Sequence, residues 1–281
     1  MTAEALAPAK INLTLHVTDR RDDGYHLLDS LVVFAGVGDR ITASPADMMS
    51  LEVTGPMAAG VPTDGSNLVL QAAGLMPDCP ARITLDKHLP AAAGIGGGSS
   101  DAAATICALT HLGGTPPPEK SVLTLGADVP VCLANRPARM RGIGDDIGQV
   151  PDLPLAHLVL VNPGIAVPTA QVFAALDGKP GKPMPETLPD WDDAGTLAQW
   201  LSGQRNDLET PACAIAPVII DVLTALSNQP DCLLARMSGS GATCFGLFAT
   251  DTQAARAARD LGTAHPTWWI ADAPILGANH G

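Results

Sequence analysis

The sequence predicts a mixed α/β fold, because segments with strand periodicity alternate with segments of helical pattern along the whole chain. Residues 7–17 alternate apolar with polar side chains, a period of two that is typical of a strand with one buried face. Residues 211–227 instead place their apolar side chains on one face of a helix. Hydrophobic residues form 46% of the 281 residues and charged residues only 16%, so the chain can bury a sizeable core.

Local patterns predict the elements of the first half of the chain. Apolar runs and alternation predict strands at residues 7–17, 27–37, 41–43, 51–53 and 82–85. Helical patterns predict helices at residues 68–76, 102–112 and 119–125. Ser66 and Asn67 introduce the first of these helices, because such side chains accept backbone N–H groups at a helix start. Residues 139–148 are predicted to form a turn between two strands.

The second half is expected to begin after Pro151 and Pro154, so we predict two domains, residues 1–152 and 153–281. Apolar runs predict strands at residues 155–161, 233–237, 244–249 and 267–271. Helices are predicted at residues 169–176, 194–201, 211–227 and 252–261. Thr169 is the expected cap of the first of these helices. The proline-rich stretch 177–190 is predicted to be a flexible surface loop.

Charge and cysteine content exclude several classes of protein. A net charge of −13 argues against nucleic acid or an anionic membrane as a partner, although a local group of backbone N–H donors can still hold a nucleotide. The six cysteines form no C-x-x-C pair, so we expect reduced thiols in a cytoplasmic protein and no zinc site. We find no apolar run of membrane-spanning length and no signal peptide.

A glycine-rich loop is the most informative stretch of the sequence. Residues 90–104 read P-A-A-A-G-I-G-G-G-S-S-D-A-A-A and lead into the predicted helix 102–112. Ser99, Ser100 and Asp101 are residue types that cap helix starts. A loop without Cβ atoms that feeds a helix N-terminus binds anions, because free N–H groups and the helix dipole meet there. The sequence therefore predicts a phosphate-binding loop.

Other phosphate loops match these residues less well. No lysine follows the glycines as a P-loop requires, and Ser99 stands where the dinucleotide fingerprint needs its last glycine. No H-R-D or D-F-G segment of a protein kinase follows. A purely structural turn is the remaining alternative, but four glycines are costly unless the backbone must approach a ligand closely.

The loop resembles the second motif of the GHMP kinases, the family of galactokinase, homoserine kinase and mevalonate kinase. Its G-G-G-S-S-D-A-A ending is similar to that of the family members that act on 4-diphosphocytidyl-2-C-methyl-D-erythritol. Five further segments match that subfamily in the same order, and they lie at residues 8–15, 23–28, 126–130, 206–209 and 237–245. The departures are small: Ile95 replaces a usual leucine, and Cys132 replaces a bulkier apolar residue.

The resemblance implies a two-lobed fold, with a ribosomal-S5-like ATP-binding lobe at residues 1–152, a ferredoxin-like lobe at 153–281 and an active site between them. It implies ATP-dependent phosphorylation of the 2-hydroxyl of 4-diphosphocytidyl-2-C-methyl-D-erythritol, a step of the non-mevalonate route to isoprenoid precursors. Another GHMP kinase is an alternative, but it would lack the Tyr25-His26 pair. A non-catalytic nucleotide-binding module is a second alternative, which the presence of both Lys10 and Asp128 disfavours.

The resemblance also implies roles for particular residues. Asp128, a lone acid among apolar neighbours, would be the catalytic base, and Lys10 would hold it and the acceptor oxygen. From sequence alone, Asp128 could equally be a helix cap and Lys10 a solvated residue of an edge strand. Magnesium would arrive with ATP, and we assign no protein ligand to it; Lys87 is expected to be solvated. The ATP-binding residues would be Pro90, Ala91, Ala92, Ala93, Gly94, Ile95, Gly96, Gly97, Gly98, Ser99 and Ser100.

The acceptor is expected to be a small molecule, a cytidine diphosphate derivative. Its binding residues, by resemblance, would be Asn12, Tyr25, His26, Thr169 and Phe173. We expect the cytosine ring between Tyr25 and Phe173, with His26 bonding its polar edge. Alternatively, Tyr25 and His26 cover the end of a sheet and Phe173 is a core residue of its helix. No nucleic acid or membrane partner is expected, and the protein would be a monomer or a weak homodimer.

Overall fold

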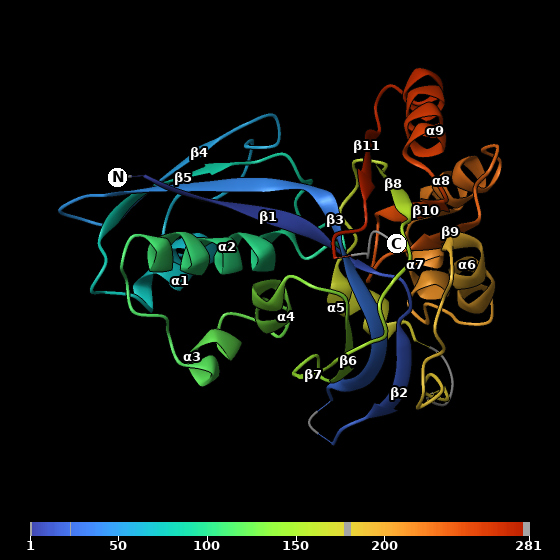
Figure 1. Cartoon of the computed structure of the whole chain (residues 1–281), viewed down its shortest axis with the longest axis horizontal. Coiled ribbons are helices and arrows are strands. Elements are labelled where there is room, and N and C mark those ends of the chain that lie inside the picture. Colours follow the sequence, from blue (N-terminus) through green and yellow to red (C-terminus); the bar gives the residue numbers. More distant parts are fainter. Residues whose placement is uncertain (1, 23, 177–180, 278–281) are drawn as a thin grey trace. The chain divides into compact units, whose positions relative to one another are not determined.

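The computed structural model describes residues 2–22, 24–176 and 181–277. The chain divides into two units: Met1–Lys10, Gly38–Ala91 and Gly96–Asn135 form the first, and Ile11–Val37, Ala92–Ile95 and Arg136–Gly281 form the second. Strands β1 (Ala3–Asn12) and β3 (His26–Pro45) contribute residues to both units (Figure 1). The predicted α/β fold is confirmed, since the residues that the structure describes form two sheets accompanied by helices. The division of the chain into domains 1–152 and 153–281 was predicted from the sequence and from the resemblance to the two lobes of the family, and it stays a prediction.

The first unit is a sheet with helices on it. Strand β4 (Ser50–Thr54) runs parallel to β5 (Ala81–Asp86), and β5 pairs antiparallel with the last residues of β3. Helices α1 (Leu68–Gly74) and α2 (Gly97–His111) pack against each other and lie below these strands in Figure 1. The helices that follow are α3 (Glu119–Leu123) and α4 (Val129–Ala134).

The second unit joins a ribbon of strands to a second sheet. The first half of β3 pairs with β2 (His16–Arg20) and with β6 (Ala138–Gly142), which pairs in turn with β7 (Asp146–Gly148). The four-stranded antiparallel sheet has the order β11-β8-β10-β9. Its strands are β8 (His157–Asn162), β9 (Leu234–Met237), β10 (Cys244–Phe248) and β11 (Trp269–Pro274).

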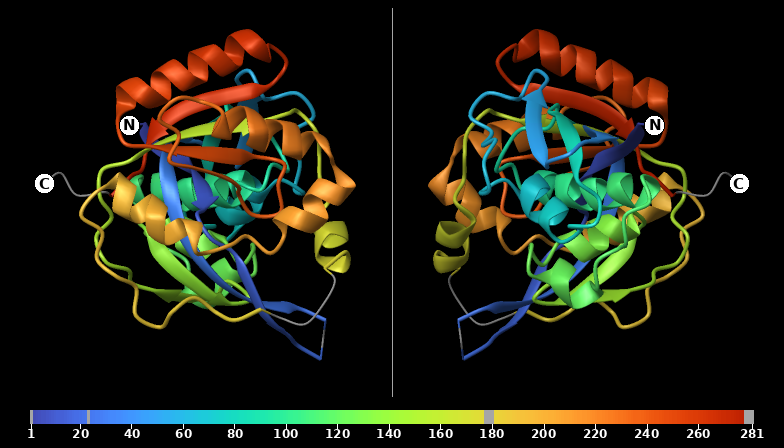
Figure 2. Two further views of the ribbon diagram at one scale, coloured as in Figure 1. Left: turned by 90° about the vertical axis from the view of Figure 1, so that its right-hand side faces the viewer. Right: turned by 90° about the vertical axis from the view of Figure 1, so that its left-hand side faces the viewer.

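Helices cover this second sheet and complete its core. They are α5 (Thr169–Ala174), α6 (Ala194–Ser202), α7 (Glu209–Ile215), α8 (Val218–Ser227) and α9 (Asp251–Ala264). Figure 2 shows α9 lying along β11. Ile219, Val222 and Leu226 of α8 and Phe248 of β10 belong to one buried apolar cluster. Among the described residues, no helix is long and apolar enough to cross a membrane.

The start of α2 corrects the helix predicted at residues 102–112. The helix begins at Gly97, and its N-cap is Gly96 in the left-handed conformation (φ 62°). Glycine reaches this conformation at little cost, so the chain can turn into the helix within the glycine run. Ser99 and Ser100 therefore lie inside the first turn, and the expectation that they cap the helix was wrong.

Three further predicted boundaries were wrong. The strand expected at residues 7–17 is interrupted after Asn12, where Leu13 N–H donates to Leu31 O and Leu15 N–H donates to Arg205 O. The helix expected at 211–227 is divided into α7 and α8 at Pro217, because proline cannot donate the N–H that a continuous helix needs. Most of the turn expected at 139–148 is formed by β6 and β7 themselves.

The proline-rich stretch expected to be a flexible loop is tied down where the structure describes it; residues 177–180 lie outside the described part. The guanidinium of Arg139 forms a two-point ion pair with Asp29, with both N–O distances 2.7 Å. The same guanidinium donates to the main-chain carbonyls of Met184, Pro185 and Glu186. A buried cation thus fixes this segment across β3 and β6.

Candidate active site

A lysine–aspartate pair is the first feature of the candidate site, and it lies within the first unit. Lys10 Nζ on β1 is 2.7 Å from Asp128 Oδ2, immediately before α4. The lysine side chain is 6% exposed and that of Asp128 is 34% exposed. Asp128 occupies the N-cap position of α4, but its side chain makes no cap hydrogen bond and instead pairs with Lys10. Lys10 is buried, so the alternative of a solvated edge-strand lysine does not hold.

The N-terminus of α2 is beside this pair. A Cβ built on Gly96 would lie 3.1 Å from Lys10 Cβ, so the loop passes directly against the lysine. The N–H groups of Gly97, Gly98 and Ser99 begin α2 and precede the first helical hydrogen bond, which runs from Ser100 N–H to Gly96 O. Because these donors lie at the positive end of a 15-residue helix, they could hold an anion next to the Lys10–Asp128 pair.

The two loop serines differ in their surroundings. Ser100 is buried, and its hydroxyl donates to Pro8 O at 2.7 Å, so its side chain joins α2 to β1. Ser99 is only half-buried and is the serine whose hydroxyl can face a ligand. Cys132 of α4 packs against Ser100, and burial raises the pKa of its thiol to about 12. The cysteine is therefore a packing residue, as its replacement of a bulkier apolar side chain suggested.

Lys87 is buried, so the expectation that it is solvated was wrong. Its ammonium pairs with Asp39 and lies 2.7 Å from Asp101 Oδ2. Asp39 also accepts the main-chain N–H groups of His88 and Leu89, which lead into the glycine loop. One buried cation therefore connects the end of β5, β3 and the start of α2. No signal in the local sequence pattern marked Asp39 as its partner.

The charges of this cluster influence one another. Burial raises the pKa of Asp101 to about 7, although the nearby Lys87 acts in the opposite direction. Burial by itself would lower the pKa of Lys87, but the carboxylates of Asp101 and Asp39 outweigh it and raise that pKa. Asp101 Oδ1 has no hydrogen-bond partner within the described residues. The Lys87 ammonium is thus the shared ion-pair partner of the two buried carboxyl groups, Asp39 and Asp101.

The residues expected to bind the acceptor lie in the second unit. The ring of His26 stacks on Phe173, with centroids 5.0 Å apart and planes at 25°. Phe173 also packs against the apolar cluster of this unit, so the core alternative describes part of its role. Tyr25 is 63% exposed. The described contacts therefore pair Phe173 with His26, whereas the sequence had paired it with Tyr25 across a base.

Thr169 does not cap α5 through its side chain, which corrects that prediction. The cap residue is Pro168, and Thr169 Oγ1 is instead 2.8 Å from Ser240 Oγ. Ser240 belongs to the second glycine loop, residues 238–243. Thr169 thus lies against this loop, where its hydroxyl is still near the protein surface.

The second glycine loop holds residues 92–95 of the first glycine loop. Ser238 Oγ donates to Gly94 O at 3.0 Å, and Thr243 N–H donates to Ala93 O. A Cβ on Gly239 would lie 2.6 Å from Gly94 O, so only glycine permits this approach. Asn206 of the N-D-L-E segment donates to the carbonyls of Met237 and Gly239. The segment noted in the sequence therefore shapes this loop.

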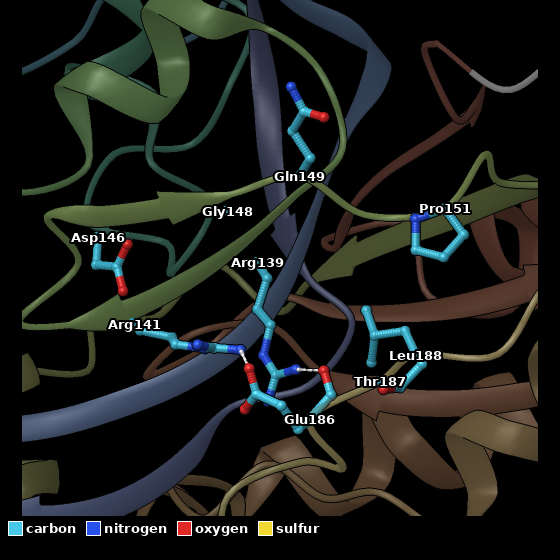
Figure 3. Close-up of a pocket in the computed structure, with 9 residues that line it drawn as sticks. All are labelled: Arg139, Arg141, Asp146, Gly148, Gln149, Pro151, Glu186, Thr187 and Leu188. Carbon is cyan, nitrogen blue, oxygen red and sulfur yellow. Dashed lines mark hydrogen bonds and ion pairs between the residues drawn. The ribbon is translucent and has the colours of Figure 1, made fainter.

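A separate hollow of about 380 Å³ lies in the second unit and contains none of the predicted site residues. Figure 3 shows Arg139 and Arg141 pointing toward Glu186, with hydrogen bonds to its carbonyl and carboxylate. Both arginines of this hollow thus donate hydrogen bonds to Glu186.

Comparison with known proteins shows the family of this chain. The family model described as "GHMP kinases N terminal domain" matches residues 67–145, and "GHMP kinases C terminal" matches residues 186–266. A 4-diphosphocytidyl-2-C-methyl-D-erythritol kinase of Cereibacter sphaeroides is 58% identical over 276 residues, which cover 98% of this chain and 99% of the relative. The chain belongs to the GHMP kinase family.

Other GHMP kinases extend the comparison. A relative from Paramagnetospirillum magneticum with the same enzyme name is 55% identical over 279 residues, covering 96% of this chain and 97% of the relative. A crystal structure of 4-(cytidine 5'-diphospho)-2C-methyl-D-erythritol kinase has a TM-score of 0.75 at 35% identity, covering 98% of this chain and all of that chain. A homoserine kinase from Cytophaga hutchinsonii shares the fold alone, with a TM-score of 0.65 at 15% identity. The chain is therefore an ATP-dependent small-molecule kinase, as the motifs implied.

Proposed function

We propose that this kinase transfers the γ-phosphoryl group of ATP to the 2-hydroxyl of 4-diphosphocytidyl-2-C-methyl-D-erythritol, a step toward isoprenoid precursors. The relatives that carry this name support the substrate, since they are 50–58% identical over 94–99% of the chain. The observation that carries the reaction type is the Lys10–Asp128 pair beside the N-terminus of α2. It brings a base and a cation next to an anion site.

The residues of the first unit fit MgATP. Backbone N–H groups of Gly97, Gly98 and Ser99 would hold the phosphates, because a phosphate needs several donors that converge at short range. Magnesium, when bound with ATP, would neutralise charge on the phosphates. The hydroxyl of Ser99 is the protein group that we propose near the ion. No three His, Cys, Asp or Glu side chains gather as a metal site within the described part of the chain.

Asp128 would act as the general base. Its Oδ2 is engaged by Lys10, so we assign the substrate proton to Oδ1. An ammonium at 2.7 Å stabilises negative charge on the carboxylate and limits its movement. The same ammonium can contact the acceptor oxygen as its negative charge develops. Lys10 would thus orient both groups that exchange the proton.

The proposal includes a cytidine clamp, formed by the side chains of Tyr25 and Phe173 on the two faces of the cytosine ring. Tyr25 would cover one face of the cytosine and Phe173 the other, which requires the His26 ring to leave the face of Phe173 that it now covers. Burial, with Arg20 nearby, lowers the pKa of His26, which favours the neutral form of its ring. A neutral imidazole offers one donor and one acceptor, which suits the mixed polar edge of cytosine.

We also propose a cytoplasmic enzyme that acts as a monomer or weak homodimer and binds no nucleic acid. The net charge of −13 supports the last point, because a polyanion would be repelled. Sedimentation of the purified protein, with and without added oligonucleotide, measures both properties.

Product analysis tests the function. The purified protein, ATP, magnesium and 4-diphosphocytidyl-2-C-methyl-D-erythritol should yield a new phosphomonoester signal in phosphorus NMR together with ADP. Mevalonate and homoserine serve as parallel acceptors. Equal or faster turnover of either would assign the protein to another GHMP kinase activity, and ATP binding without any turnover would favour a non-catalytic module.

A further inference from the structure

Ser30 is a buried hydroxyl on β3 that no motif singled out. It lies between the side chain of Asn12 and the backbone of Thr14, all within the second unit. Ser30 Oγ donates to Thr14 O at 2.5 Å, and Asn12 Nδ2 donates to Ser30 Oγ at 2.8 Å. Ser30 and Asn12 are 1% and 4% exposed, so water does not replace these bonds.

The direction of the two hydrogen bonds determines how the Asn12 amide is turned. A backbone carbonyl can only accept, so the single proton of Ser30 is committed to Thr14 O. The oxygen of Ser30 must then accept from its other neighbour. Only the NH₂ group of Asn12 can donate to it, and the amide oxygen is therefore directed away from Ser30.

The frame around this hydroxyl is itself fixed. Thr14 Oγ1 accepts the N–H of Leu31 and donates to Met184 Sδ. The main-chain N–H of Asn12 donates to Ser238 Oγ at 3.1 Å, which anchors the residue from its other side. Neither Thr14 O nor Asn12 can therefore move away from Ser30 without breaking further hydrogen bonds.

This orientation leaves one atom without a partner. Asn12 Oδ1 is buried and accepts no hydrogen bond from any described residue. Burial of an unsatisfied carbonyl oxygen is unfavourable, and such atoms in a native protein need an explanation. A ligand that brings a donor to Oδ1 provides one, and the hydroxyls of a sugar alcohol are donors of suitable size.

We propose that Ser30 is a positioning residue that fixes Asn12 as a hydrogen-bond acceptor, so that Asn12 Oδ1 receives a hydroxyl of the acceptor substrate. The inference rests on the proposed function in one respect, the identity of the acceptor. It adds a direction to the contact: the site selects a donor at this point of the substrate and rejects a group that can only accept.

The test compares Ser30→Ala with wild type. Without the hydroxyl, the Asn12 amide can turn over and present NH₂ to the substrate. Loss of one neutral hydrogen bond should raise KM for the acceptor about threefold to tenfold, while KM for ATP stays unchanged. Thr105→Val is the matched control, since it removes another fully buried hydroxyl that donates to a backbone carbonyl. This control should leave KM for the acceptor unchanged.

A double-mutant cycle separates positioning from packing. If Ser30 acts through Asn12, Ser30→Ala should have no further effect on KM for the acceptor in an Asn12→Ala background. Equal effects of Ser30→Ala in both backgrounds, or an unchanged KM in the single variant, would overturn the proposal. The wild-type reaction is measured first, so a protein that does not phosphorylate this acceptor contradicts the proposed function instead.

An NMR measurement on the unmodified protein covers the case in which Ser30→Ala fails to fold. The side-chain NH₂ protons of Asn12 should show nuclear Overhauser contacts to the β protons of Ser30. NH₂ protons that lack these contacts would mean that the amide is turned the other way, and the proposal would be wrong.

Discussion

Lys10 and Asp128 are 118 residues apart in sequence, yet their side chains meet at 2.7 Å within the first unit. The lysine is almost fully buried and the carboxylate is partly open. A buried ammonium that holds a half-open carboxylate is suited to proton transfer, since one partner is fixed and the other is reachable.

Asp128→Asn should lower kcat by about 10²–10⁴ while the Kd for ATP changes little. The amide keeps the shape of the side chain but cannot take a proton from the acceptor hydroxyl. Steady-state kinetics and ATP titration measure the two quantities. Asp64→Asn, an exposed aspartate of the same unit, is the control. A variant with near-wild-type kcat would remove Asp128 from the mechanism.

Gly96→Val should weaken ATP binding at least tenfold. The residue has φ 62°, which a branched side chain strongly disfavours, and its Cβ would press on Lys10. Isothermal titration with ATP tests this. Gly74→Ala in α1 is the control, because a Cβ there meets nothing within 4 Å. Unchanged ATP affinity in a folded Gly96→Val protein would argue that the loop is only a structural turn.

Lys87→Met should lower the free energy of unfolding by about 3–5 kcal/mol, because it leaves two buried carboxyl groups without their cation. Chemical denaturation measures the loss. Lys120→Met, on the exposed helix α3, is the matched control and should change little. A Lys87→Met protein as stable as wild type would show that the buried cluster contributes nothing to stability.

The stability of wild type relative to Asp101→Asn should fall as the pH rises from about 4 to about 7. The folded pKa of Asp101 is raised to about 7 from an ordinary value of 3.8. The folded state therefore keeps a proton that the unfolded state releases in this range, and its advantage is lost as the pH passes the folded pKa. Denaturation curves of both proteins at pH 4.5 and pH 8 measure the difference. A pH-independent difference would contradict the raised pKa.

Tyr25→Ala should raise KM for the cytidine acceptor about tenfold, since stacking on a base is worth roughly 1–3 kcal/mol. Tyr25 is 63% exposed, so the melting temperature should change little. Phe173→Ala should raise the same KM and also lower the melting temperature, because Phe173 packs on the core. KM for ATP is the internal control. If neither variant changes KM for the acceptor, the cytidine clamp is wrong.

The sequence alone determined several local elements of the fold and the family of the protein. The period of two along β5 and the Asn67 cap of α1 are local, because each depends on residues a few positions apart. The order of six motifs identified the family before any contact was known. The break between α7 and α8 at Pro217 was not predicted, because the helical pattern continues on both sides of it.

Only the tertiary structure decided which polar residues are buried and what they contact. Lys87 looked like a solvated lysine, but Asp39 and Asp101, 48 and 14 residues away, enclose it. No local pattern predicted a role for Ser30, because the role that we propose depends on its hydrogen bonds with Asn12 and Thr14. A hydrogen bond in the interior depends on direction and distance between strands, and the local pattern of a sequence records neither.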